Sequence, residues 1–361
     1  MHADARFVEP IAQEAGEAVM GWDVGGAHLK AARVEADGRI SGVWQEACPL
    51  WRGLEHLHVA IDRILAESPP LAWHAITMTG EMTDLFETRQ AGVYALVDVL
   101  CQCLVTGRVR FYGGALGWLD AAATRLHAEQ VASANWHASA HLVATRLGDG
   151  LLVDIGSTTT DIIPIRNWGV ATFSASDSDR LVAGELVYTG VVRTPVMALA
   201  TEAPVAGHWA PLMAEHFATS ADVYRVLGWL PETADQQDSA DGGPKTAEAS
   251  RARLARMMGR DACTLPEGAW AELAAWFADA QLERISRAAR QVLSRGLLEP
   301  NAPLVIAGTG AFLGERLAAR LGRPIMNFSQ LLTAGSMSGR VDWCAPAVAV
   351  GWLLAGEKKC K

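Results

Sequence analysis

The sequence contains no apolar stretch close to the roughly 20 residues that are needed to cross a lipid bilayer. Its first residues include Asp4, Glu9 and Glu14 and show neither the basic segment nor the apolar core of a secretory signal. It also has no basic run with interleaved aromatic residues, and its formal net charge is −9. We therefore expect a cytoplasmic protein that binds neither a membrane nor a nucleic acid.

Cysteine is scarce and irregularly spaced, with six residues and no disulfide framework, which is typical of free thiols in a reducing compartment. The length of 361 residues and the hydrophobic content of 50% allow two domains, each with its own core. Because the chain is acidic overall, an anionic substrate has to be bound by local groups and not by the global field.

Two segments, 19–30 and 151–162, repeat one pattern: a buried apolar strand, an aspartate, a turn of small residues and a second strand. The backbone N–H groups of such turns can cradle phosphate, and Asp23 and Asp154 at the strand ends can hold a hydrated divalent cation. The pattern predicts two hairpins that clamp a polyphosphate and its metal. The residues predicted to cradle phosphate are Gly25, Gly26, Gly156, Ser157, Thr158 and Thr159.

A third segment predicts a buried strand over 303–307, a tight turn at Gly308, Thr309 and Gly310, and a helix over 312–321 whose N-terminus is a further anion site. In this order the three segments resemble the phosphate-one, phosphate-two and adenosine motifs of the acetate and sugar kinase, heat-shock-seventy and actin superfamily. The resemblance implies an α/β protein with the two-domain, actin-like ATPase (ribonuclease H-like) fold and a phosphate-binding cleft between the domains.

The pattern along the chain predicts a domain organisation. It consists of a leader at 1–18, a first domain at 19–148, a second domain at 149–344 and a C-terminal helix at 345–356 that returns to the first domain. Within the second domain we expect strands at 169–173 and 186–192, a helix over 210–227 and a mobile surface loop over 231–247.

Four further runs narrow the resemblance: residues 80–86, 111–115, 134–136 and 153–161 look like the hydantoinase A and oxoprolinase-related family in its short single-chain branch. The similarity extends over nearly all of residues 19–355. The branch is associated with tetrahydromethanopterin-linked one-carbon transfer, as in methylotrophy. Its members resemble a methanofuran-biosynthesis enzyme, a transferase that joins an aminomethylfuran-methyl diphosphate to the phenol of tyramine, glutamyl-tyramine or tyrosine and releases diphosphate.

The resemblance implies site roles for several residues. Asp23 and Asp154 would hold Mg²⁺ or another divalent cation, while a nucleotide is possible but not expected. Lys30 either turns back to the diphosphate as a point charge or lies on the solvated side of its strand. Glu81 and Asp84, in the turn at 80–84, are candidates for amine recognition or for the base.

Two other residues are open between a functional and a structural role. Asp161, on the returning strand of the second hairpin, would reach the metal or only cap the turn, and Arg193 would form a surface ion pair or face the site. The expected partners are a small-molecule diphosphate and a phenolic amine, and the sequence leaves the oligomeric state unknown.

Three other functions fit the same fold. One is an ATP-dependent small-molecule kinase or ATPase, although no adenine-stacking residue is evident beside residues 308–311. Another is a hydantoinase-type, ATP-dependent amidohydrolase subunit, which the short chain makes less attractive. The third is a regulator or chaperone accessory that binds a nucleotide without turnover, and the polar turn at 80–84 argues against it.

Overall fold

The structure is a computed structural model that describes residues 17–173, 175–334 and 337–357. Residues 1–16 of the predicted leader lie outside these residues. None of the helices in the described part of the chain has both the length and the apolar composition needed to span a membrane.

The first domain is built on a six-stranded sheet with the order β3-β2-β1-β4-β5-β6. β1, β2 and β3 form an antiparallel meander, and β4 and β5 run parallel to β1. The hairpin of β1 and β2 is the one predicted over residues 19–30. The strands are β1 (Val19–Val24), β2 (His28–Val34), β3 (Ile40–Ala47), β4 (Trp73–Met78), β5 (Arg108–Tyr112) and β6 (Trp118–Leu119). The helices are α1 (Glu55–Glu67), α2 (Arg89–Cys103), α3 (Ala121–Leu126), α4 (Ala128–Val131) and α5 (Asn135–Arg146).

The second domain repeats this arrangement with the strand order β10-β8-β7-β13-β14, and β9 pairs with β8. β7 and β8 are antiparallel, whereas β13 runs parallel to β7 as β4 does to β1. The strands are β7 (Gly150–Ile155), β8 (Thr160–Arg166), β9 (Gly169–Val170), β10 (Leu186–Val187), β13 (Leu304–Ala307) and β14 (Ile325–Asn327). The helices near this sheet are α6 (Asp177–Ala183), α10 (Gly314–Leu321) and α11 (Ser338–Trp343). Strands were predicted to reach residues 173 and 192, but β9 and β10 end at Val170 and Val187.

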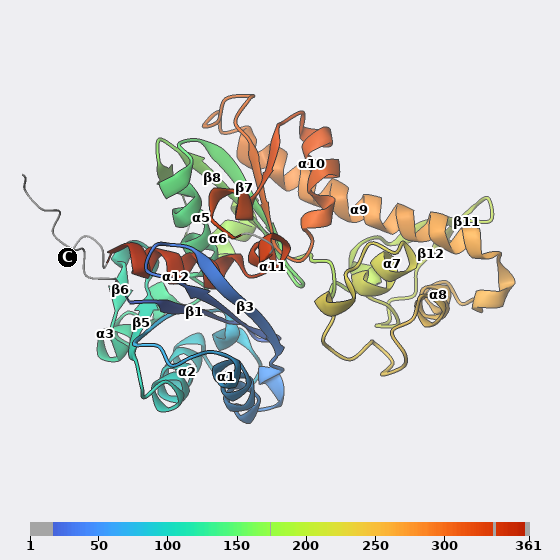
Figure 1. The fold of residues 1–361 in the computed structure, drawn as a ribbon. Coiled ribbons are helices and arrows are strands. Elements are labelled where there is room, and N and C mark those ends of the chain that lie inside the picture. Colours follow the sequence, from blue (N-terminus) through green and yellow to red (C-terminus); the bar gives the residue numbers. More distant parts are fainter. Residues whose placement is uncertain (1–16, 174, 335–336, 358–361) are drawn as a thin grey trace, which may run out of the picture.

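An outlying group of elements extends from the second sheet along the long helix α9 (Glu267–Leu293), as Figure 1 shows. The group contains β11 (Glu202–Val205), β12 (His208–Pro211), α7 (Ser220–Val226) and α8 (Ala247–Arg256). The prediction of one helix over 210–227 was wrong, because β12 occupies its start and the helix begins only at residue 220. A capping box between Thr219 and Asp222 fixes that start.

The segment predicted as a mobile surface loop, 231–247, crosses to the first domain. The side-chain amide of Gln237 donates to the Ala27 carbonyl oxygen over 2.7 Å, and Arg52 forms an ion pair with Asp238 at 2.9 Å. This loop therefore touches the turn of the first hairpin.

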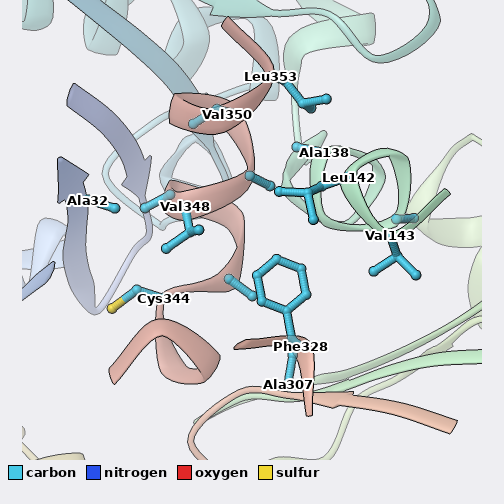
Figure 2. Packing of buried hydrophobic residues seen from close by; sticks show 14 of the residues in the cluster. Ala32, Ala138, Leu142, Val143, Ala307, Phe328, Cys344, Val348, Val350 and Leu353 are labelled. Atoms are coloured by element: carbon cyan, nitrogen blue, oxygen red, sulfur yellow. The ribbon is translucent and has the colours of Figure 1, made fainter. Parts of the chain in front are cut away.

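Helix α12 (Ala345–Glu357) packs against β1, β2, β4 and α5. Figure 2 shows Val348, Val350 and Leu353 of this helix within a buried apolar cluster that also includes Leu142 and Phe328. The cluster takes members from both sheets, such as Ala32 on β2 and Ala307 on β13. One hydrophobic layer therefore joins the two domains.

Contact between α12 and β1 is close enough to involve the backbones. A Cβ atom on Gly21, in the middle of β1, would lie 2.0 Å from the Ala347 carbonyl oxygen and 2.7 Å from the Gly351 nitrogen. Glycine weakens most strands, but here its missing side chain lets the helix lie directly on the strand.

Replacing Gly21 with alanine should destabilise the protein by roughly 1–3 kcal/mol or more, because the added methyl group has no space against the helix backbone. Gly356→Ala, in helix α12 that Gly21 contacts, is the matched control, since a Cβ atom at residue 356 meets nothing within 4 Å. Urea denaturation of both variants measures the difference. Equal stability of the two variants would contradict this account of the packing.

Candidate active site

The two hairpins have the same local geometry. The N–H of Gly25 donates to the His28 carbonyl oxygen over 3.0 Å, and the N–H of Gly156 donates to the Thr159 carbonyl oxygen over 2.8 Å. In each hairpin the aspartate is the next-to-last residue of the first strand. The sequence pattern therefore folds twice into one form of turn.

The two turns face a cavity of about 640 Å³ between the domains. Eleven of the predicted site residues line it: Asp23, Gly25, Gly26, Lys30, Asp84, Asp154, Gly156, Ser157, Thr158, Thr159 and Asp161. Glu81, Gly308, Thr309 and Gly310 do not line it. The cavity thus collects both hairpins and part of the turn at 80–84, which packs through Thr83 against Gly26.

Asp23 is a buried carboxylate and Asp154 a half-buried one, and both line this cavity. Desolvation, with a smaller contribution from the charge of Asp161, raises the pKa of Asp23 to about 6 and the pKa of Asp154 to about 7. Asp23 Oδ1 accepts no hydrogen bond from the described residues. Because buried charge needs compensation, the pair suits a divalent cation, and Mg²⁺ is commonly held by one or two carboxylates together with substrate phosphates.

Lys30 pairs with Asp23 in the register of β1 and β2 and lies on the cavity side of its strand. Its ammonium donates to the carbonyl oxygen of Trp343, at the end of α11, over 2.8 Å. Its charge lowers the pKa values of both Asp23 and Asp154. Lys30 is therefore in the cleft, which is the first of the two positions considered from the sequence.

Asp161 takes the place in the second hairpin that Lys30 takes in the first, because it pairs with Asp154. Arg180 of α6 binds it at 2.5 Å and stacks at 4.1 Å from the centre of the Trp136 ring. The charge of Asp161 is thus already neutralised within the protein. Within residues 17–173, 175–334 and 337–357, no group of three or more His, Cys, Asp or Glu side chains forms a metal-binding cluster. The predicted metal role of Asp161 stays a prediction.

Glu81 lies below the cavity surface and reaches it through another side chain. The hydroxyl of Ser133, which lines the cavity, donates to Glu81 Oε1 over 2.8 Å. Arg89 contacts Glu81 at 3.3 Å and Asp177 of the second domain at 3.1 Å. Burial raises the pKa of Glu81 despite these contacts. Asp84 is exposed at the cavity.

The turn at Gly308–Gly310 packs against the end of β7. A Cβ atom on Gly308, whose φ is +87°, would lie 2.2 Å from the Ile155 carbonyl oxygen, and the N–H of Gly310 donates to that oxygen over 2.8 Å. Thr309 is buried, and its hydroxyl has no hydrogen-bond partner among the described residues. In this structure the glycines allow a close backbone contact, and their predicted role in binding a cofactor stays a prediction.

Several residues that line the cavity did not emerge from the sequence. Arg180 and Asp177 lie on α6, a helix that was not predicted, and Ser133 has a positive φ of 52°. The run at 134–136, which was noted only for its family resemblance, supplies Asn135 to the cavity and Trp136 to the Arg180 stack. That run was the available signal for this side of the site.

Comparison with known proteins agrees with the fold and the motifs. Residues 73–338 match the hydantoinase/oxoprolinase family, so the chain belongs to this family. A solved structure of acetone carboxylase, in a nucleotide-free form, aligns with a TM-score of 0.51 and 11% identity over 94% of this chain and 70% of its own. This likeness supports the two-domain actin-like fold alone.

Two relatives carry a more specific name, "(4-{4-[2-(gamma-L-glutamylamino)ethyl]phenoxymethyl}furan-2-yl)methanamine synthase". The protein from Methanocaldococcus jannaschii is 32% identical over 245 residues, which are 67% of this chain and 72% of the relative. The protein from Methanococcus vannielii is 36% identical over 111 residues, which are 31% of this chain and 50% of the relative.

We expect Mg²⁺ to raise the melting temperature of the wild-type protein. Asp154→Asn should abolish this increase while keeping the fold, because the amide has the shape of the carboxylate but not its charge. The melting temperature should be no lower than that of the wild type, since a buried charge is removed. Thermal unfolding with and without Mg²⁺ measures both effects. Asp62→Asn, on the exposed face of α1, is the control. A wild-type response to Mg²⁺ in Asp154→Asn would remove the second hairpin from the metal site.

Proposed function

We propose that this protein is an ether-forming enzyme of methanofuran biosynthesis. It condenses an aminomethylfuran-methyl diphosphate with the phenol of tyramine, glutamyl-tyramine or tyrosine and releases diphosphate. The name of the two relatives supports this proposal, because it describes a furan methanamine joined through a phenoxymethyl group. The observation that carries it is the cavity with a glycine-containing hairpin and an aspartate of raised pKa on each side.

The hairpins supply the groups that a diphosphate needs. Backbone N–H groups of the two turns would bind phosphate oxygens, and Asp23 and Asp154 would hold the divalent cation that neutralises the leaving group. Lys30 would contribute a positive charge beside both carboxylates.

The reaction forms one bond and breaks another at the methylene carbon of the furan substrate. The phenol oxygen bonds to this carbon, and the electron pair of the broken C–O bond leaves with the diphosphate. The furan ring delocalises the positive charge that develops, so the protein has mainly to stabilise the leaving group and to position the phenol.

Loss of the phenol proton requires an acceptor, since phenol has a pKa near 10. Asp84 is open to the cavity, and Glu81 connects to it through the Ser133 hydroxyl. These two carboxylates are the proposed base or the groups that bind the substrate amine.

Glu81→Gln and Asp84→Asn distinguish the two candidates. Loss of the base should lower kcat by about 10²- to 10⁴-fold with little change in KM for the diphosphate, because general base catalysis contributes that much to the rate. Loss of an amine-binding group should instead raise KM for the substrate whose amine that group binds. Steady-state ether formation measures both constants, and Glu87→Gln is an exposed control. Wild-type kinetics in both variants would exclude the turn at 80–84 from either role.

The decisive test incubates the pure protein and Mg²⁺ with the furan diphosphate and each phenolic amine, or with ATP alone. Diphosphate, phosphate and ether product are followed together. We expect release of one diphosphate for each ether formed, and removal of Mg²⁺ with a chelator should stop it. Turnover of ATP without ether would instead support the kinase or ATPase function.

A further inference from the structure

Arg193 is tied to the second phosphate turn through the backbone. Its N–H donates to the Ser157 carbonyl oxygen over 2.9 Å, and the N–H of Val192 donates to the same oxygen over 3.1 Å. Gly190 comes so close to the turn that a Cβ atom would lie 2.4 Å from the Thr158 nitrogen. The position of Arg193 is therefore fixed relative to Ser157 and Thr158.

The guanidinium of Arg193 meets the first domain at Trp51. Its central carbon lies 5.0 Å from the centre of the Trp51 ring, and both residues line the main cavity. Both also line a neighbouring cavity of about 240 Å³. Stacking on an aromatic ring orients a guanidinium and leaves the N–H groups at its edge free to bind an anion.

Arg193 has no ion pair and no side-chain hydrogen bond within the part of the chain that the structure describes. The other arginines near the cavity differ: Arg180 binds Asp161, and Arg89 binds Asp177. Burial by the surroundings also lowers the pKa of Arg193. A cation that lines the cavity next to the second turn, with no ion-pair partner among the described residues, is available for a ligand.

The charges of the cleft indicate which part of a ligand this cation would meet. Asp23 and Asp154 would offset the two charges of a divalent cation, which leaves Lys30 against a diphosphate ester with about three negative charges. A single lysine does not balance that charge. An outer phosphate needs a further cation, and arginine suits it because its planar fork can bind two phosphate oxygens at once.

We propose that Arg193 binds the outer phosphate of the diphosphate and makes the site select a diphosphate over a monophosphate. This inference rests on the proposed function for the identity of the substrate. The binding role itself concerns only the anion. Trp51 holds the guanidinium in place, so it acts as a positioning residue.

Calorimetry tests the inference. It measures the affinity of the protein for inorganic diphosphate and for phosphate, each in the presence of Mg²⁺. Arg193→Ala should weaken diphosphate binding by about 10- to 100-fold, the usual effect of losing hydrogen bonds to a charged group, and should leave phosphate binding nearly unchanged. Arg193→Lys should recover part of the loss, and Trp51→Ala should show a smaller one. Arg52→Ala is the control, because Arg52 adjoins Trp51 but pairs with Asp238 and does not line the main cavity.

Equal diphosphate affinity in Arg193→Ala and the wild type would overturn the inference, and so would the absence of diphosphate binding by the wild type. Melting temperatures of all variants check that they are folded. Ether formation by the wild type is measured separately. Loss of diphosphate binding in Arg193→Ala together with no ether from the wild type would keep the anion site and reject the proposed reaction.

Discussion

The direct contact between helix α12 and strand β1 is the constraint on which the cleft depends. Gly21 allows the backbone of α12 to lie against the centre of the first sheet, and the same helix packs on α5 within a layer that reaches the second sheet. Because this layer is closely packed, it fixes how the two sheets face each other. Both hairpin turns consequently open into one cavity, although 131 residues separate Asp23 from Asp154 in the chain.

The two hairpins are alike in backbone but different in charge. Lys30 and Asp161 occupy equivalent places beside Asp23 and Asp154, so the first hairpin carries a cation and the second an additional carboxylate. Arg180 compensates that carboxylate, and Arg193 on the same domain has no such partner among the residues that the structure describes. The cleft therefore offers charged groups of both signs. This asymmetry suits the proposed substrate, which carries a diphosphate at one end and an amine at the other.

Most of the architecture could be predicted because its signals are local. Apolar runs of strand length that break at glycine turns indicated the hairpins, helical periodicity over 312–321 indicated α10, and the predicted C-terminal helix at 345–356 is α12. The errors lie where tertiary contacts override local pattern. β12 and the capped start of α7 replace a single predicted helix. The segment 231–247 is largely a loop, as predicted, and it contacts the first hairpin through Gln237, while its mobility stays a prediction.

The two phosphate-type turns, their aspartates and the family of the chain follow from the amino-acid sequence alone. They depend on residues adjacent in the chain, whose backbone preferences are read directly. Three contacts become visible only in the folded protein: Ser133 connects Glu81 to the cavity, Arg180 neutralises Asp161, and Arg193 meets Trp51. The last of these pairs is 142 residues apart. No local pattern encodes such contacts, because the partners are not neighbours in the chain, and the last pair forms only where the two domains meet.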